Sequence, residues 1–201
     1  MLKAKGDLDG AEPLCRRALE IKEAALGPDH PHTGTSVGNL AQLLKAKGDL
    51  DGAEPLCRRA LEIKEAALGP DHPHTGTSVG NLAQLLKAKG DLDGAEPLYR
   101  RALEIREAAH GPDHPDTGQS VNNLAGLLKA KGDLDGAEPL YRRALAIKVA
   151  VNGPDHRNTG KKALALAKVL KEMGRSKEAA ELRAKYAVAI GGSNQSVCVL
   201  S

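Results

Sequence analysis

The sequence predicts an all-α fold, a solenoid of stacked antiparallel helical hairpins. Three observations carry this prediction. The phrase AKGDLDGAEPL recurs, beginning at Ala4, Ala46, Ala88 and Ala130, so the repeat period is 42 residues. The 201-residue chain has no Phe or Trp and only 3 Tyr, and its Leu- and Ala-rich core suits closely packed helices better than a β-sandwich. Each repeat also holds two stretches of helical periodicity that end at glycine.

The first helix of a full repeat is expected to run to about Lys47. Thr33, Thr35 or Ser36 offers a side chain that can cap its N-terminus. Gly48 is expected to end it, because glycine adopts the left-handed conformation of a helix terminus. Its apolar side carries residues at helical spacing: Val37, Leu40, Ala41 and Leu44.

A second helix is expected after the GDLDG turn. Asp51 and Glu54 have the spacing of a capping box, and Pro55 falls near the first turn, where proline is tolerated. Gly69 and Pro70 are expected to end this helix. Its apolar side carries Ala53, Leu56, Cys57, Ala60, Ile63 and Ala67. Because neither helix can bury its apolar side alone, the hairpins must stack.

These signals divide the chain into six segments. They are a partial first repeat at 1–27 that keeps only its second helix, repeats at 28–69, 70–111 and 112–153, a degenerate C-terminal capping repeat at 154–190, and a flexible tail at 191–201. Because the first repeat lacks most of its first helix, apolar surface is expected to be exposed at that end. Self-association there is one consequence, and a chain that is a fragment of a larger multi-repeat protein is an alternative.

The repeat resembles the tetratricopeptide repeat, in which small residues let helices pack closely. The 42-residue period and the phrases NLA, AEPLYRRALEI and GPDHP are more specifically similar to kinesin light chain-like proteins, over roughly residues 1–187. The resemblance implies a protein-interaction scaffold that binds extended peptides on a concave surface lined by the first helices. Gly34 and Gly38 depart from the family pattern, and each costs a helix interior about 0.5–1 kcal/mol relative to alanine. The small-residue positions are held by Ala41, Gly48, Ala53 and Ala60.

The resemblance places the binding groove on the first helices, beside their packing residues. An asparagine amide both donates and accepts, so it can pair with a peptide backbone. Lysines favour an acidic ligand by Coulomb attraction. The sequence therefore predicts a groove for an extended, acidic peptide partner, and the alternative is a solvated face without a specific ligand. The candidate peptide-binding residues are Asn39, Gln42, Lys45, Asn81, Gln84, Lys87, Asn122, Asn123, Lys129, Lys161 and Lys168.

The histidine-containing loops are interpreted as inter-repeat turns. The DHPH phrase offers His30 and His32, but a metal site needs three or four converging ligands. Later repeats replace the second histidine with Asp116 and Asn158, so a structural turn is favoured over a metal site.

The sequence predicts no catalytic residue, no metal site and no cofactor. Cys15 and Cys57 align with Tyr99 and Tyr141 on the apolar side of the second helix, so they are expected to be core residues. The sequence has no Ser-His-Asp arrangement, phosphate loop or paired-carboxylate signature, which favours a scaffold over an enzyme.

Charge and hydropathy restrict the partners and the location. The net charge is +3, and acidic and basic residues are interspersed, so a nucleic-acid partner is not expected. No run approaches the roughly 18 apolar residues of a membrane span, and the N-terminus lacks the apolar segment of a signal peptide. A cytoplasmic location is therefore expected.

The chain ends in CVLS, which has the form of a C-a-a-X prenylation box at Cys198. A terminal serine favours farnesyl transfer. This leaves two interpretations: a farnesylated adaptor with peripheral membrane contact, or an incidental tail.

Overall fold

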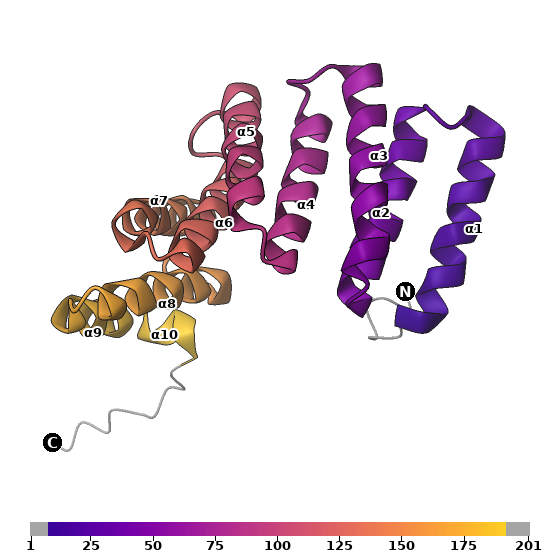
Figure 1. The fold of residues 1–201 in the computed structure, drawn as a ribbon. Coiled ribbons are helices and arrows are strands. Elements are labelled where there is room, and N and C mark those ends of the chain that lie inside the picture. Colours follow the sequence, from indigo (N-terminus) through magenta and orange to yellow (C-terminus); the bar gives the residue numbers. More distant parts are fainter. Residues whose placement is uncertain (1–7, 192–201) are drawn as a thin grey trace, which may run out of the picture. The chain divides into compact units, whose positions relative to one another are not determined.

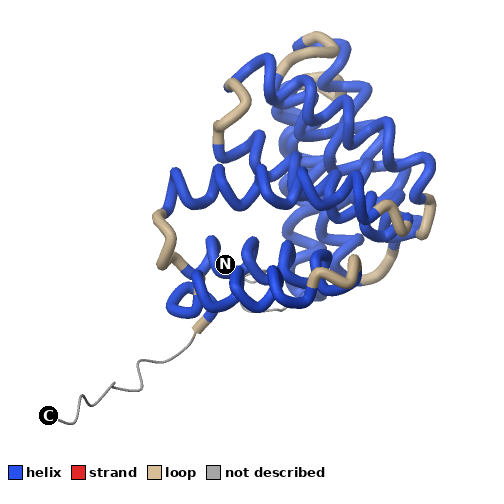
Figure 2. The backbone as a smooth tube through the Cα atoms, turned by 90° about the vertical axis from the view of Figure 1, so that its left-hand side faces the viewer, coloured by secondary structure: helices blue, strands red, loops and turns tan. Residues whose placement is uncertain are grey.

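The computed structural model describes residues 8–191. These residues form ten α-helices joined by short loops and contain no strand (Figure 2). The all-α prediction is thus confirmed over the described residues. The chain divides into two compact units, Met1–Ala109 and His110–Ser201.

The first unit holds five helices that run alongside one another (Figure 1, indigo to magenta). They are α1 (Leu8–Leu26), α2 (Pro31–Lys47), α3 (Leu50–Leu68), α4 (Pro73–Lys89) and α5 (Leu92–His110), whose last residue belongs to the second unit. Helix α2 packs against α1 and α3, and α3 packs against α4. The first helices α2 and α4 also contact each other directly, which places their polar residues on adjoining surfaces.

The second unit continues the pattern of paired helices. It comprises α6 (Pro115–Lys131), α7 (Leu134–Asn152), α8 (Arg157–Glu172), α9 (Ser176–Lys185) and the short α10 (Ala187–Ile190). Helix α7 packs against α6 and α8. Helix α8 is then covered by α9 and α10, which close the end of this unit.

The first helices begin earlier than the sequence predicted, and a histidine caps them. In α2 the His32 N–H donates to Nδ1 of His30, at 3.1 Å. The predicted cap at Thr33, Thr35 or Ser36 is therefore wrong. Thr33 is fully buried and its hydroxyl instead donates to the Gly27 carbonyl at 2.8 Å, which ties the loop to the end of α1. The histidine cap recurs in the other first helices at His72, His114 and His156.

The second helices also use a different cap from the one expected. In α3 the Asp49 carboxylate accepts from the Gly52 N–H at 2.9 Å. A Cβ atom at Gly52 would lie 2.3 Å from that carboxylate, so the cap itself requires glycine. The predicted capping box of Asp51 and Glu54 is wrong because both carboxylates pair with Lys89, at 2.7 and 2.8 Å.

The apolar core lies between the paired helices, largely where helical periodicity placed it. In α3 the buried stripe is wider than predicted and includes Leu61, because α3 packs against helices on two sides. Ala67, expected in the core, is exposed near the end of that helix. Burial raises the pKa of the Cys57 thiol to about 11, so this core thiol stays protonated and unreactive. The predicted core is confirmed at Val37, Leu40, Ala41, Leu44, Ala53, Cys57, Ala60 and Ile63.

Helix α1 exposes the apolar surface that the sequence led us to expect. Leu14 and Ile21 are 59% and 53% exposed, whereas Ile63, at the position of Ile21 one repeat later, is only 4% exposed. Ile63 lies against Gly34 of the preceding first helix, and no described helix takes that place beside α1. Cys15 is consequently half-buried rather than part of a closed core.

An interhelical ion pair repeats along the first unit. Lys47 at the end of α2 pairs with Glu12 of α1 at 2.7 Å, and Lys89 of α4 pairs with Glu54 of α3 at 2.8 Å. The Lys89 ammonium, followed by Arg58, lowers the pKa of Glu54. Each pair joins the end of a first helix to the start of the preceding second helix.

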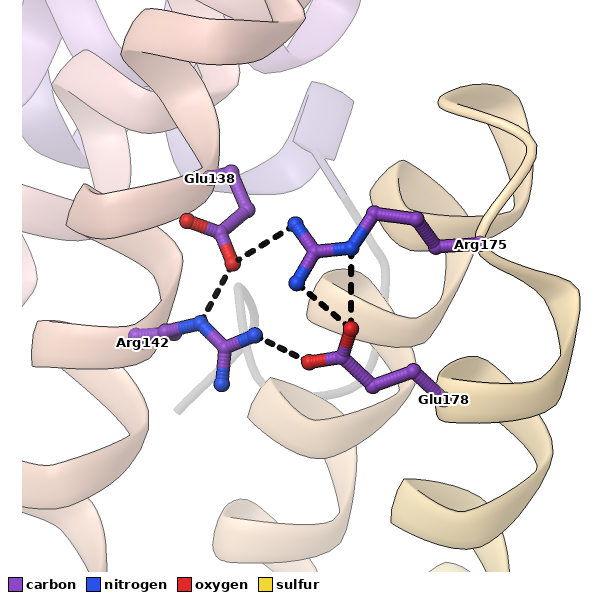
Figure 3. Close-up of polar contacts among 4 residues, drawn as sticks. All are labelled: Glu138, Arg142, Arg175 and Glu178. Carbon is purple, nitrogen blue, oxygen red and sulfur yellow. Dashed lines mark hydrogen bonds and ion pairs between the residues drawn. The ribbon is translucent and has the colours of Figure 1, made fainter.

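The last repeat keeps this connection with different residues. Met173 stands where the repeat pattern would place the lysine. Arg175 takes over its role and lies 3.4 Å from Glu138 of α7 (Figure 3). Arg142 and Arg175 both pair with Glu178, and Arg142 also pairs with Glu138, so four alternating charges join α7 to α9.

Candidate peptide-binding surface

Helices α2 and α4 bring several predicted residues together. Lys45 Nζ donates to Gln84 Oε1 at 3.1 Å, so the predicted polar residues of neighbouring first helices touch. Gln42, three residues before Lys45, has a buried Nε2 with no hydrogen-bond partner among the described residues. Burial lowers the pKa of Lys87, one turn beyond Gln84. The C-terminal halves of α2 and α4 therefore share a partly buried polar surface formed by Gln42, Lys45, Gln84 and Lys87.

A pocket of about 120 Å³ lies between the N-terminal parts of α2 and α4, and we call it the α2–α4 pocket. Two predicted residues, Asn39 and Asn81, line it. Two glycines of α2, Gly34 and Gly38, also line it. Its lining comprises Gly34, Thr35, Gly38, Asn39, Lys64, His74, Thr77, Ser78 and Asn81.

Gly34 and Gly38, which depart from the family pattern, differ in how much space a side chain would have. A Cβ atom at Gly34 would lie 2.9 Å from Cγ2 of Ile63 and 3.5 Å from Cε of Lys64. A Cβ atom at Gly38 would lie 3.7 Å from Ala60, which is ordinary contact. Gly34 is thus needed for α3 to approach α2, whereas the position of Gly38 has room for a methyl group.

Sequence reasoning missed Lys64, which reaches this pocket from the second helix α3. Its side chain is only 6% exposed, and its Nζ donates to Thr35 Oγ1 at 2.8 Å. Burial lowers its pKa. Arg106 of α5 repeats the arrangement and donates to Thr77 Oγ1 at 3.4 Å. A signal was available in the sequence, because this position is basic in the first four repeats: Lys22, Lys64, Arg106 and Lys148.

A larger cavity of about 580 Å³ shares Thr35, Lys64 and His74 with the α2–α4 pocket. Burial lowers the pKa of His74, and the nearby charge of Lys64 and then of His72 and His32 lowers it further. No aspartate or glutamate is among the described residues that line either cavity, so their electrostatic character is positive. The lining of the larger cavity is His30, Pro31, His32, Thr35, Lys64, Leu68, His72 and His74.

The histidines do not form a metal site. Within residues 8–191, no three side chains of the His, Cys, Asp and Glu types gather in a way that could hold a metal ion. His30 and His72 each use Nδ1 to accept the N–H that caps a helix. This local role supports the interpretation of the DHP loops as inter-repeat turns.

In the second unit the predicted residues are more dispersed. Asn123 accepts a hydrogen bond from Gln119 at 2.8 Å. Lys129 pairs with Glu172 of α8 at 2.8 Å, so a carboxylate already balances this predicted groove cation. Lys161 is exposed on α8, as is Lys168, which lines a separate cavity of about 290 Å³ between α8 and α9. Asn122 is half-buried on α6.

Cys198 lies outside the described residues, so the structure does not bear on the prenylation prediction. None of the helices described between residues 8 and 191 combines the length and the apolar character needed to cross a bilayer.

Comparisons with known proteins agree with this architecture. The chain matches the tetratricopeptide repeat profile over residues 1–66, 36–108, 80–148 and 119–185. It is similar to the solved structure of BtubC (BKLC) from P. vanneervenii, with a TM-score of 0.83 and 25% sequence identity, over 97% of this chain and 78% of that one. It is also similar to a solved structure of nearly identical TPR-like repeats from a Podospora anserina protein described as a kinesin light chain. The TM-score is 0.80 at 24% sequence identity, over 97% of this chain and 92% of that one, so the two share the fold. No curated protein sequence matches the chain.

Proposed function

The chain belongs to the tetratricopeptide repeat family, and on that premise we propose that it is a protein-interaction scaffold whose first helices bind an extended, acidic peptide. The observation that carries this proposal is the α2–α4 pocket, where Asn39 and Asn81 meet a buried lysine and no carboxylate. The proposed scaffold acts by binding alone, without a catalytic residue or cofactor. Its proposed location is the cytoplasm.

The chemistry of the pocket supports this ligand class. Each asparagine amide offers two donors and an acceptor, which matches the alternating groups of an extended peptide backbone. A cation in a partly desolvated site attracts an acidic side chain more strongly than it would in water. Acidic residues of the peptide would therefore be preferred at the positions that face the pocket.

A substitution that changes the charge but not the shape of one side chain tests the proposal. Asn81→Asp keeps the side-chain shape but adds a negative charge inside the pocket. The control, Asn158→Asp, makes the same chemical change at an exposed position of α8 in the other unit. Fluorescence anisotropy would compare labelled pools of acidic and basic peptides with the full chain. We expect the acidic pool to bind more tightly, and only Asn81→Asp to weaken it. Equal binding of the two pools would contradict the proposal.

We also propose that the exposed face of α1 associates with a second copy of the chain. Leu14 and Ile21 occupy positions that are better covered in α3, so a helix from another molecule would bury them. Replacing both with lysine should abolish a concentration-dependent dimer in sedimentation velocity. A monomer at all concentrations in the unaltered chain would refute this proposal.

The alternative of a farnesylated, membrane-tethered adaptor rests on the CVLS sequence alone. A single lipid chain gives marginal anchoring, so peripheral and reversible membrane contact is the form proposed. Intact mass and membrane fractionation in eukaryotic cells, with Cys198→Ser as the control, test it. An unmodified chain in the soluble fraction would remove this alternative.

A further inference from the structure

We propose that the α2–α4 pocket binds a phosphate group carried by a phosphorylated residue of the bound peptide, with Lys64 as its central cation. This inference rests on the proposed peptide-binding function and narrows its ligand. Three features of the pocket support it: an unbalanced cation, donors from three helices, and positive surroundings that suit a dianion.

Lys64 is a buried cation that no carboxylate among the described residues of its pocket balances. Its side chain is 6% exposed and lies at the pocket between two first helices. The hydrogen bond to Thr35 uses one of the three ammonium protons, and that acceptor is neutral. Elsewhere in the first unit, Lys47 and Lys89 each pair with two carboxylates at 2.7–2.8 Å. Burying a cation without a counter-charge is costly, so an anion bound beside Lys64 would recover that cost.

Side chains from three helices line the same pocket. Asn39 comes from α2, Lys64 from α3 and Asn81 from α4. Amide and ammonium groups can donate hydrogen bonds to an oxyanion. A phosphate group presents three strong acceptor oxygens, whereas a carboxylate presents two, so donors arriving from three directions match the phosphate better.

The described side chains that surround the pocket include basic groups and no carboxylate. His74 lines both the α2–α4 pocket and the larger cavity, where His30, His32 and His72 also lie. A phosphate monoester carries about −1.5 to −2 charges at neutral pH, so it attracts Lys64 more strongly than the single charge of a carboxylate does. Burial and Lys64 lower the pKa of His74, and its neutral ring can still donate one hydrogen bond to the phosphate. The described lining residues supply no acidic side chain that would repel the ligand.

The test compares three peptide pools that differ in one fixed central residue: phosphoserine, serine or glutamate, with the same degenerate flanks. Binding to the full chain would be measured by fluorescence anisotropy. We expect the phosphoserine pool to bind about 10- to 100-fold more tightly than the other two, the range of a charge-assisted hydrogen-bond set. Lys64→Met, which keeps an apolar stem of similar length, should remove this preference. Lys22→Met is the matched control, because Lys22 holds the same repeat position but is exposed on α1.

The outcomes separate the two proposals. If glutamate binds as tightly as phosphoserine, the acidic-peptide function stands and the phosphate inference fails. If serine binds as tightly as both, the acidic-peptide function fails as well. Inorganic phosphate that binds the chain without competing with phosphopeptide would mean a free-anion site and would overturn the inference. Gly38→Ala, which places a methyl group in the pocket wall without steric conflict, should also weaken the phosphoserine pool. It tests the inference even if Lys64→Met does not fold.

Discussion

Two glycines on one helix allow a prediction in which the chemical change is identical and only the packing differs. Gly34 and Gly38 both lie within α2, one turn apart. Replacing glycine by alanine in a helix interior stabilises the folded state by about 0.5–1 kcal/mol, chiefly by reducing the entropy of the unfolded chain. That contribution is the same for both variants. Their difference in unfolding free energy therefore reports the fit of a single methyl group.

The structure sets the sign and the size of that difference. The new methyl at Gly38 would lie 3.7 Å from Ala60, so Gly38→Ala should be more stable than the parent by about 0.5–1 kcal/mol. The new methyl at Gly34 would lie 2.9 Å from Cγ2 of Ile63, which is itself 4% exposed and has little room to move. Overpacking of this kind costs about 1–3 kcal/mol. Gly34→Ala should therefore be less stable than Gly38→Ala by about that amount.

Urea denaturation of both variants and the parent, followed by circular dichroism, measures this difference. Midpoints should rank Gly38→Ala above the parent and Gly34→Ala last, with unchanged denaturant slopes. If Gly34→Ala proved as stable as Gly38→Ala, the close approach of α3 to α2 would not depend on the missing methyl. The packing explanation for this departure from the family pattern would then be refuted.

Three further predictions concern the helix caps, a histidine and the terminal charge cluster. His72→Ala should lower the free energy of unfolding by about 0.5–2 kcal/mol. His72→Asn should lower it much less, because asparagine also caps helices. Equal losses in the urea midpoints of the two variants would show that the cap is unimportant. His74 should titrate below the ordinary histidine pKa of 6.5 by NMR, and Lys64→Met should raise its pKa by removing a nearby charge. In the unaltered chain, folded His74 binds fewer protons than unfolded His74 at pH values below about 6.5. The free energy of unfolding should therefore decrease as the pH falls below about 6.5. Arg175→Ala should lower the free energy of unfolding by about 0.5–1 kcal/mol, because Arg175 pairs with both Glu138 and Glu178. Arg17→Ala breaks one exposed pair and should change it by close to zero. Equal thermal midpoints for the two variants would contradict a stabilising role of the cluster.

Part of the candidate site could be predicted from the sequence, because helical spacing fixes which residues share a face. Helical spacing puts Asn39 and Asn81 beside the packing residues, the resemblance to the repeat family assigns that face to binding, and both line the α2–α4 pocket. Lys64 was not predicted, because it belongs to the second helix and reaches the pocket past Gly34. Lys129 was predicted as a groove cation, but its neutralising partner comes from a different helix. Such pairings depend on side-chain reach across helices, which periodicity does not contain.

The sequence by itself determined the helical hairpin, its 42-residue repetition and most of its core, because these follow from local periodicity, turn glycines and copied segments. The tertiary structure decided which polar groups serve the fold and which remain for a ligand. It assigned the loop histidines to helix caps and Asp51 and Glu54 to interhelical ion pairs. It also buried Lys64 without a carboxylate among the residues that line its pocket. The physical reason is that charge compensation and burial are set by residues far apart in the chain, so they arise only when the helices pack.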